Sequence, residues 1–401
     1  MAVCCAMLVF IMFGSGVTSA ADGSPSIVIN IAARTLSHYT GGVLVKEYPI
    51  AIGKPSTPSP LGEFEVIEKI INPWWFPTTP GMEPVPSGPA NPLGYRWIGF
   101  ASTYGVHGTN MPWSVGTAAS KGCIRMLEED VEELFPHVFL GTPVTIIYDT
   151  IRTAMDKQGC AYITVYEDAY DYGTTTASRL QQKIADLGVQ DLVNTANIYD
   201  LLHGELGKPQ LIGQVITLKL NGRTSEQKGI IINDIILIPY TALSQSIGLN
   251  AEINYATGSI VWQGLTMQGE FRQSGLYLRM WDLCTLLGAE GLYDQTTATA
   301  SVEVTRVSYN GKPLWAQVRR INGIIALPVQ TLLSATGRNE ELRVIEQNIT
   351  VAGRKIPAVL YGDTPYIQIT RLQEALNIYV YYDTQSSMIS LTSIPFASGG
   401  S

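Results

Sequence analysis

Histidine and cysteine are scarce in this 401-residue chain, which has four histidines and five cysteines. Cys4 and Cys5 belong to an apolar N-terminal stretch and the other three cysteines lie far apart, so the sequence excludes a disulfide framework. No histidine follows His203, and the last thiol, Cys284, lies in an apolar segment. A copper or zinc site needs clustered imidazole or thiolate ligands. We therefore expect no metal and no cofactor.

Charged residues are also few, at 15%, while apolar residues make up 46%, and this balance excludes an intrinsically disordered chain. The formal net charge of −8 argues against nucleic acid as a partner and against a polybasic membrane contact, because an acidic surface repels polyanions. A polymer that carries both amines and carboxylates is not excluded. The length allows about two to four domains, each with its own core.

Long apolar runs are absent as well. No stretch reaches the roughly 18 uninterrupted apolar residues that span a bilayer, so we expect no membrane span in the mature chain. Residues 2–13 are apolar and small residues follow in VTSAAD, which predicts a signal peptide over 1–21, cleaved near Ala20 or Ala21. No Lys or Arg precedes the apolar run, so we expect the true start to lie upstream. The alternative is a buried first strand.

Residues 22–150 are predicted to form one mostly β domain. Apolar and polar residues alternate in short runs on both sides of TGG, which indicates a hairpin, and GEFEVIEKII and RWIGFASTYGVHG are typical of further strands. Residues 72–94 contain seven prolines and are expected to form a long functional loop. A helix with acidic residues in its first turn is expected over 127–135, and GTPVTIIYD closes the domain as a strand.

Residues 151–214 are expected to connect this domain to the rest of the chain. They contain a strand-like AYITVYED, a helix-like TASRLQQKIADLG and a second short helix capped by Asn194 or Thr195. The last residues, 394–401, are predicted to form a disordered tail.

The segment between them is internally repetitive. Four units each combine a turn, an apolar strand and a short amphipathic helix, and the turns are expected at Gly222, Gly269, Gly311 and Gly353. Spacings of 47, 42 and 42 residues suit a solenoid or a propeller blade, but the helix in every unit argues against a propeller. Paired units that form two small α+β domains, 215–306 and 307–393, fit better.

One stretch, HGTNMPWSVGTAASKGCIRM, combines a histidine and a cysteine, His107 and Cys123. A cysteine is a nucleophile only as its thiolate, and a nearby imidazole can take the proton. The spacing suits a histidine at the end of one strand and a cysteine in the loop that returns to it. The alternative is that both are core residues, as isolated cysteines usually are, although the polar, glycine-rich flanks weaken that interpretation.

The turn before the cysteine also suits acyl transfer. Ser120, Lys121 and Gly122 form a short polar turn, and we expect the backbone N–H groups of Gly122 and Cys123 to point at one spot as an oxyanion hole. Arg125 is expected to bind a substrate carboxylate.

These residues resemble a known family. From about Ser26 to Asp149 the chain resembles the L,D-transpeptidase catalytic domain of bacterial cell-wall enzymes, through AIGKPSTPSPLGEF, INPWWFPT, PSGPANPLG, VHGT, SKGCIRM and GTPVTII in the family's order. The resemblance implies a β-sandwich catalytic domain and a fold that is mainly β with α+β parts. It maps the nucleophile onto Cys123 and the general base onto His107, with Gly122 and Ser120 in the signature turn.

Other positions are candidates for substrate contacts. They are Arg125, Lys121, Trp74, Trp75, Gly108 and Thr109. The family's commonest turn has histidine where this chain has Lys121, which is expected either to place a positive charge near the thiolate or to point to solvent. The Trp74–Trp75 pair is expected either to form one wall of the site on the side where the acceptor binds, or simply to pack within its loop.

The resemblance further implies a secreted, cell-wall-associated enzyme acting on peptidoglycan stem peptides and inhibited by β-lactams of the carbapenem type. Cys123 would attack the bond before a terminal D-Ala, and a neighbouring stem's amine would capture the acyl-enzyme to give a 3→3 cross-link. Capture by water would make the protein an L,D-carboxypeptidase. A degenerate, non-catalytic wall-binding protein and a cysteine peptidase acting on proteins are further alternatives.

Residues 215–393 resemble, more diffusely, two copies of the stalk-type domain named after the N-terminal region of copper amine oxidases, through their NGR, NGK and LP turns. The residues themselves do not favour copper. The expected role is a spacer or adhesive unit that holds the catalytic domain within the wall.

Overall fold

The computed structural model describes residues 23–77, 81–262, 265–338, 343–345, 348–351, 354–384 and 386–394. The predicted signal peptide and most of the predicted tail lie outside these residues. The chain separates into two compact units, Met1–Lys157 with Ala161–Ile212, and Gln158–Cys160 with Gly213–Ser401. Strands make up 43% and helices 19%, which confirms the mainly β fold class.

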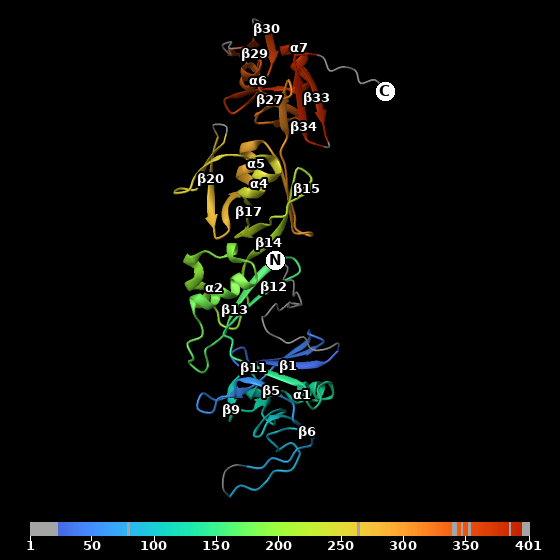
Figure 1. Ribbon diagram of the computed structural model, residues 1–401, viewed down its shortest axis with the longest axis vertical. Coiled ribbons are helices and arrows are strands. Elements are labelled where there is room, and N and C mark those ends of the chain that lie inside the picture. Colours follow the sequence, from blue (N-terminus) through green and yellow to red (C-terminus); the bar gives the residue numbers. More distant parts are fainter. Residues whose placement is uncertain are drawn as a thin grey trace. The chain divides into compact units, whose positions relative to one another are not determined.

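Two sheets form the centre of the first unit (Figure 1). The first sheet has the order β3-β2-β1-β11-β5, and the second has the order β10-β8-β7-β6. The strands of the first sheet are β1 Pro25–Asn30, β2 Thr35–Thr40, β3 Val43–Pro49, β5 Gly62–Glu65 and β11 Pro143–Ile147. Those of the second are β6 Glu68–Ile71, β7 Arg96–Ala101, β8 Tyr104–His107 and β10 Ile124–Arg125.

The predicted hairpin at TGG is confirmed as the β2–β3 connection. Gly41 and Gly42 have φ of +56° and +79°, the left-handed region that two-residue hairpin loops require. Alternate residues of the two sheets then meet in one buried core, represented by Ile29 and Ile146 on one side and Ile98 and Val106 on the other. The opposite face of the second sheet lies outside this core and is available for polar side chains.

Shorter elements complete this unit. They are β4 Ile52–Gly53, β9 Ala118–Ser120, β12 Ile151–Met155, β13 Cys160–Val165, the α-helices α1 Glu128–Leu134, α2 Ala177–Asp186 and α3 Ile198–Leu202, and the 3-10 turns η1 Pro112–Ser114, η2 Phe135–His137, η3 Gln190–Leu192 and η4 Thr195–Asn197. The expected helix after the cysteine is confirmed as α1, and its residues Val131 and Leu134 are buried. Asn194, one of the two expected caps, accepts from the Ala196 N–H.

The second unit repeats a strand-then-helix pattern four times. Its helices are α4 Tyr240–Ile247, α5 Met280–Leu287, α6 Val329–Ala335 and α7 Leu372–Leu376, with the 3-10 turn η5 Ile369–Arg371 before α7. Its strands are β14 Gln210–Leu220, β15 Arg223–Thr224, β16 Gly229–Ile232, β17 Ile235–Pro239, β18 Glu252–Asn254, β19 Ser259–Trp262, β20 Leu265–Arg272, β21 Gly275–Arg279, β22 Glu290–Asp294, β23 Thr299–Glu303, β24 Arg306–Tyr309, β25 Lys312–Leu314, β26 Arg319–Ile321, β27 Ile324–Pro328, β28 Arg343–Ile345, β29 Asn348–Val351, β30 Arg354–Pro357, β31 Val359–Tyr361, β32 Thr364–Gln368, β33 Tyr379–Asp383 and β34 Met388–Thr392.

The two halves of this unit repeat the same hydrogen bonds. β14 pairs in parallel with β23, and β24 pairs in parallel with β34. The Asn221 side chain accepts from the Val304 N–H, and the Asn310 side chain accepts from the Ser393 N–H, each pair 83 residues apart in sequence. Buried residues form one core within 216–304 and another within 307–391. These features support two similar halves, whose assignment as stalk-like domains stays a prediction.

One predicted turn is wrong. Gly269 lies inside β20, opposite Leu278, rather than between strands. A Cβ at this position would lie 2.7 Å from the Leu276 Cδ1, so the glycine gives room for a leucine packed over the strand. Asn221–Gly222 and Asn310–Gly311 do form turns with positive φ, whereas Gly353 lies outside the described residues.

Over the ranges that the structure describes, no helix is both long and apolar enough to cross a membrane.

Candidate active site

Strands β8 and β10 bring the histidine and the cysteine to one place. His107 is the last residue of β8, as the sequence predicts, and Cys123 directly precedes β10. The two strands are parallel neighbours, with Ile124 beside Val106 and Arg125 beside His107. One residue earlier, this register places Cys123 beside Gly105.

The register also sets which way the side chains point. Successive residues of a strand face opposite sides, so Cys123, Arg125 and His107 share one face. The residues between them, Val106 and Ile124, are fully buried in the core on the other face. Two residues along the strand and one strand across correspond to roughly 8 Å between the Cα atoms of His107 and Cys123. Their side chains therefore lie on neighbouring positions of one surface.

The His107 ring is held in a defined orientation. Its Nδ1 lies 2.6 Å from the Gly108 carbonyl oxygen, and its ring stacks on the Trp97 indole with centroids 5.8 Å apart. A carbonyl can only accept, so Nδ1 carries the proton and donates it, which leaves Nε2 as the basic nitrogen. Burial lowers the pKa of His107 to about 4, and the Arg125 charge acts in the same direction, against the hydrogen bond to Gly108. The imidazole is therefore neutral at neutral pH.

Two glycines make room for the indole. A Cβ on Gly105 would lie 2.7 Å from the Trp97 ring, and a Cβ on Gly99, its partner across β7 and β8, would lie 3.0 Å from the indole Nε1. The same Nε1 donates to Glu68 at 3.0 Å. Trp97 consequently lies over the two glycines and packs against the face of the imidazole.

The Cys123 thiol is partly exposed and hydrogen-bonded at rest. Its Sγ donates to the Thr103 carbonyl at 3.6 Å and receives the Gly105 backbone N–H. Burial raises the pKa of Cys123, while that N–H and the Arg125 charge oppose the rise. The thiol is therefore protonated at neutral pH.

The signature turn has a different hydrogen-bond pattern from the one expected. Gly122 donates its N–H to the Ser120 Oγ at 3.0 Å, and that hydroxyl donates to the Cys123 carbonyl at 2.6 Å. A side chain in the same turn thus accepts the Gly122 N–H in this geometry, and the role of Gly122 as an oxyanion donor stays a prediction. Gly122 is needed for another reason. Its φ is +117°, and a Cβ would lie 2.5 Å from the Tyr104 ring.

Gly108 and Thr109 are engaged within the protein. A Cβ on Gly108 would lie 2.2 Å from a carboxylate oxygen of Glu128, the first residue of α1. That carboxylate accepts the Tyr95 N–H at 2.8 Å and the Thr109 N–H. The Thr109 hydroxyl accepts the Met111 N–H at 3.1 Å. Both residues thus shape the end of β8, and their predicted substrate contacts stay predictions.

Arg125 and Lys121 differ in environment. The Arg125 backbone pairs with Ala51, and its Nε is buried without a hydrogen-bond partner among the described residues. Its charge acts on both the His107 imidazole and the Cys123 thiol. Lys121 is exposed. The Arg125 guanidinium lies on the same face as the thiol and is suited to donate hydrogen bonds to a substrate anion.

The proline-rich loop is organised around one buried amide. Asn91 is 0% exposed, and its Nδ2 lies 2.8 Å from the Pro73 carbonyl and 3.3 Å from those of Val85 and Pro86. The Trp75 backbone pairs with Val85. Trp74 is 56% exposed and stacks on Phe76. These contacts lie within the loop, so a role of Trp74 and Trp75 in walling the acceptor side stays a prediction.

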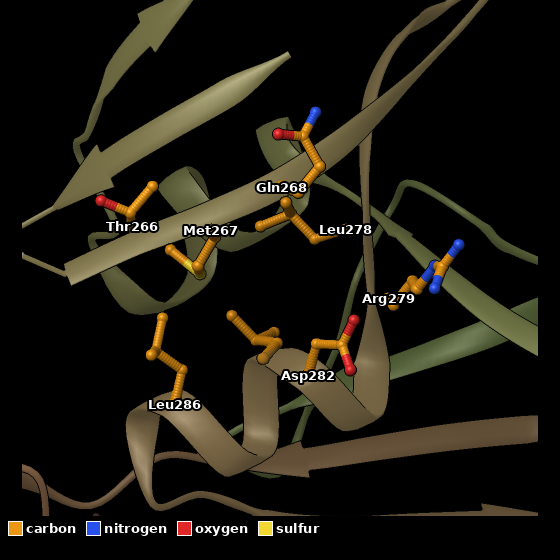
Figure 2. A pocket seen from close by; sticks show the side chains of 8 residues that line it. Thr266, Met267, Gln268, Leu278, Arg279, Asp282 and Leu286 are labelled. Carbon is orange, nitrogen blue, oxygen red and sulfur yellow. The ribbon is translucent and has the colours of Figure 1, made fainter. Parts of the chain in front are cut away.

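A cavity of about 220 Å³ lies in the second unit, between β20, β21 and α5 (Figure 2). It is lined by the apolar Met267 and Leu286 and by the polar Gln268, Arg279 and Asp282. It contains no cysteine or histidine, and Cys284 is buried in the core formed with α5. Within the described ranges, no three His, Cys, Asp or Glu side chains are grouped to hold a metal ion.

Sequence reasoning missed the residues that support the histidine. Trp97 and Gly105 contribute through strand register, and Glu128 reaches back from a helix. A tight turn at residues 102–103 alone would place Ile98 opposite His107, and the bulge between Gly99 and Ala101 shifts the register by one residue so that Trp97 lies there. Nothing in the local sequence points to Glu128, whose acidic character suited the start of a helix equally well.

Known proteins share this region. Residues 24–146 match the family model described as the YkuD L,D-transpeptidase catalytic domain. YkuD of Bacillus subtilis is 41% identical over 121 residues, which are 30% of this chain and 64% of the relative. YqjB of the same species is 37% identical over 134 residues, 32% of this chain and 73% of the relative. ErfK/SrfK of Salmonella typhimurium is 34% identical over 156 residues, 35% of this chain and 50% of the relative.

Solved structures match more distantly. An L,D-transpeptidase from Mycobacterium smegmatis is 24% identical with a TM-score of 0.26, over 31% of this chain and 59% of that one. L,D-transpeptidase 3 from Mycobacterium tuberculosis, in complex with a faropenem-derived adduct, is 24% identical with a TM-score of 0.25, over 31% and 60%. The chain spans about half to two thirds of the length of the first curated relatives, between 50% and 64%. Through the region that carries His107 and Cys123, the chain belongs to the L,D-transpeptidase family.

Proposed function

We propose that the protein is a peptidoglycan L,D-transpeptidase that forms 3→3 cross-links between stem peptides through a Cys123 acyl-enzyme. The observation that carries this proposal is the shared face of His107 and Cys123, with the imidazole tautomer held by Gly108 so that Nε2 is basic. Family membership supports acyl-transfer chemistry in general.

The reaction follows from these two side chains. His107 Nε2 takes the Cys123 thiol proton as Sγ bonds to the carbonyl carbon before the terminal D-Ala. The tetrahedral intermediate then breaks its C–N bond, and the imidazolium returns the proton to the leaving amine of D-Ala. In the second half, an acceptor amine loses a proton to His107, attacks the thioester and releases Cys123 as a thiol. No oxidant, metal or cofactor takes part.

Arg125 provides charge recognition in this proposal. A donor stem ends in a carboxylate, and the Arg125 guanidinium lies on the same face as the thiol. A bidentate ion pair between Arg125 and that carboxylate would position the adjacent peptide bond over the Cys123 Sγ. The substrates place the protein in the cell wall, outside the cytoplasm.

The L,D-carboxypeptidase activity remains the second candidate, because water and an amine use the same base. The contacts that hold the His107 ring in place disfavour the non-catalytic alternative. A degenerate site has no need for glycines at 99 and 105 under the indole or for a fixed tautomer.

Intact-mass spectrometry after exposure to imipenem tests the nucleophile. The ring-opened β-lactam should add one drug mass to the wild-type protein, none to Cys123→Ala, and one to the matched control Cys284→Ala, whose thiol lies in the second unit. An adduct that survives in Cys123→Ala, or no adduct on the folded wild-type protein, contradicts the proposal.

Purified disaccharide-tetrapeptides separate the two outcomes of the acyl-enzyme. A transpeptidase releases D-Ala and accumulates cross-linked dimers, whereas a carboxypeptidase releases D-Ala and leaves free tripeptide stems. Dimers that form with wild-type protein and not with His107→Gln support the cross-linking role. Tripeptide alone would assign the carboxypeptidase activity instead.

A further inference from the structure

A tyrosine cluster joins the end of the predicted catalytic domain to the connecting region. Tyr148 and Tyr170 stack with centroids 5.4 Å apart, and Tyr172 contacts both rings. Asp168 fixes the cluster, because its carboxylate accepts the Tyr148 hydroxyl at 2.6 Å and the backbone N–H groups of Tyr172 and Gly173 at 3.0 and 2.7 Å. These bonds hold the pKa of Asp168 below its usual range.

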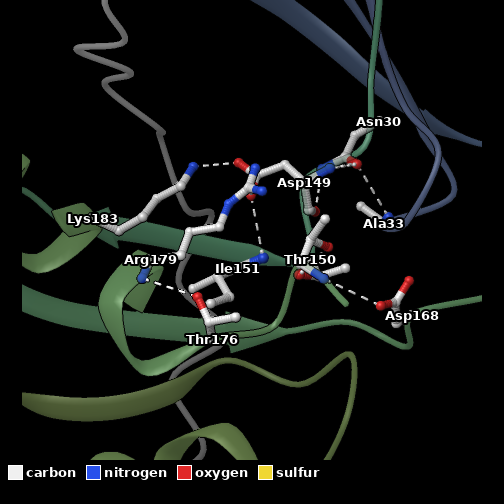
Figure 3. A network of polar contacts seen from close by, with 10 residues as sticks. Asn30, Ala33, Asp149, Thr150, Ile151, Asp168, Thr176, Arg179 and Lys183 are labelled. Carbon is white, nitrogen blue, oxygen red and sulfur yellow. Dashed lines mark hydrogen bonds and ion pairs between the residues drawn. The ribbon is translucent and has the colours of Figure 1, made fainter. Parts of the chain in front are cut away.

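The cluster is anchored on its other side to the end of β11 and to α2. Asp149 forms ion pairs with Arg179 and Lys183 of α2, and its backbone exchanges hydrogen bonds with the Asn30 side chain (Figure 3). Figure 3 shows Asp168 beside this network, close to Thr150. The segment that carries Tyr170 is therefore fixed at both ends.

The Tyr170 hydroxyl reaches away from the cluster into the catalytic domain. It donates to the Gly53 carbonyl at 2.9 Å and accepts the Ser59 N–H at 3.1 Å. The Ser59 hydroxyl in turn accepts the Gly53 N–H at 2.9 Å. Tyr170 is 8% exposed and Ser59 is 2% exposed, so these bonds are shielded from water and difficult to replace.

Gly53 and its neighbour contact the turn that carries the nucleophile. β4 pairs in parallel with β9, with Gly53 beside Ser120, and the Lys54 N–H donates to the Ser120 carbonyl at 3.0 Å. The Ser120 hydroxyl then donates to the Cys123 carbonyl and accepts the Gly122 N–H. The hydroxyl of Tyr170 is thus linked to the Cys123 backbone through Gly53 and Ser120.

We propose that Tyr170 is a positioning residue for the reaction: through Gly53 and Ser120 its hydroxyl fixes the turn that presents the Cys123 thiol to His107. Tyr170 lies outside the residues 24–146 that match the catalytic-domain family, so this chain uses its connecting region to complete the site. The inference rests on the proposed function for its effect on acylation, but the link itself is independent of it.

A phenylalanine at position 170 tests the role, since it keeps the ring in its stack and removes the hydroxyl alone. The matched control is Tyr172→Phe, which removes a hydroxyl from the same cluster on a side chain that is 49% exposed. Two readouts are needed: the rate constant of imipenem acylation at saturating drug with its apparent affinity, and hydrogen exchange of peptides that cover residues 118–123.

In Tyr170→Phe we expect acylation at saturation to slow by about tenfold or more, with apparent affinity within about twofold of wild type. We also expect faster exchange at Gly122 and unchanged exchange in α2. A variant that merely loses stability would speed exchange in α2 as well and leave the acylation rate of its folded fraction unchanged. Tyr172→Phe should match the wild type in both readouts.

Unchanged exchange at residues 118–123, or faster exchange with an unchanged acylation rate, overturns the proposal. Should Tyr170→Phe fail to fold, Ser59→Ala breaks the same link at the Gly53 N–H and should give the same two effects. Failure of the proposed function looks different, because the wild-type protein then takes no adduct while the exchange measurement still decides whether Tyr170 controls the turn.

Discussion

At the scale of single residues, the candidate site pairs a neutral base with a neutral nucleophile. Burial lowers the pKa of His107 to about 4 and raises the pKa of Cys123. A resting thiolate–imidazolium pair would require the opposite shifts. In the proposed reaction we therefore expect the thiol to be deprotonated during attack, by general-base transfer to His107, rather than stored as a thiolate.

The lowered pKa of His107 predicts that stability falls in mild acid. The unfolded imidazole titrates near 6.5 and the folded one near 4, so below about pH 6.5 the unfolded state binds a proton that the folded state does not. We expect this residue to lower the free energy of unfolding by about 2 kcal/mol at pH 5 relative to pH 7.5. Urea titrations at the two pH values, with unfolding monitored by hydrogen exchange of core peptides from the first unit, measure this difference in the free energy of unfolding.

His107→Gln provides the control for this effect, because an amide can donate to Gly108 but does not titrate. In this variant the stability should lose the part of its pH dependence that comes from His107. The part that comes from His38, whose pKa is also lowered by burial, should remain. Equal pH dependence in the two proteins would contradict the assignment.

Arg125 predicts a second pH effect. Its charge lowers the pKa of Cys123, so replacement by glutamine should raise that pKa and reduce the thiolate fraction near neutrality. We expect severalfold slower alkylation of Cys123 by iodoacetamide between pH 7 and 8, and a rise that continues to higher pH than in wild type. The measurement is adduct formation by mass spectrometry, with exposed Arg223→Gln as the control. Faster alkylation in Arg125→Gln would refute this electrostatic role.

The sequence predicts the candidate reacting residues, His107 and Cys123, but not the residues that contact and orient them. His107 and Cys123 are recognisable because few residue types perform this chemistry and their flanks are distinctive. Trp97 and Tyr170 have ordinary sequence neighbours. The role of Trp97 arises from the register of β7 and β8. The role of Tyr170 arises from its hydroxyl, which contacts Gly53 at a sequence separation of 117 residues. Such contacts depend on tertiary packing, which local patterns do not encode.

At the scale of elements, the β9–β10 turn determines whether the thiol is presented. Its shape depends on Gly122, which combines φ of +117° with contact to the Tyr104 ring, and on the Ser120 hydroxyl that bridges the turn. The turn expected from the sequence is present, and the Gly122 amide donates a hydrogen bond within it. Motif position alone does not distinguish a glycine amide that bonds within its turn from one that faces a substrate.

Gly122→Ala should therefore be severe. The added Cβ would lie 2.5 Å from a Tyr104 ring carbon, in a backbone conformation that L-residues avoid, so we expect about 1–3 kcal/mol of destabilisation and a loss of acylation of about 100-fold or more. Gly116→Ala is the matched control, because its φ is +87° but nothing lies within 4 Å of the added Cβ. Imipenem acylation rates compare the two. Comparable losses in both variants would show that backbone strain, not the clash at the turn, is responsible.

Element patterns in the second unit show both the strength and the limit of periodicity. The strand-then-helix units were predictable because an apolar run leads directly into an amphipathic one, as in β17 and α4. Gly269 was misplaced because a glycine between two polar residues, Gln268 and Glu270, suits a turn and a strand equally well, and only the position of Leu276 over it decides.

At the scale of the whole molecule, two asparagines perform the same task in the two halves of the second unit. Asn221 and Asn310 both have φ of +49°, and each side chain closes a loop onto the end of the strand that pairs with its own. Asparagine suits both demands, because it tolerates a left-handed backbone and also hydrogen-bonds. Each half is thus closed by its own asparagine hydrogen bond, and both bonds join residues of the second unit alone.

This arrangement predicts local and equivalent effects. Asn221→Ala and Asn310→Ala should each destabilise their own half by about 2 kcal/mol, roughly half from the left-handed backbone and half from the lost hydrogen bond. Asn→Gly at the same positions should recover the backbone share only. Hydrogen exchange of peptides from β23 and β34 measures each half, and imipenem acylation of Cys123 should stay at the wild-type rate in all four variants. A slower acylation rate would show that the second unit controls the reaction, and a β34 effect from Asn221→Ala would show that its two halves unfold together.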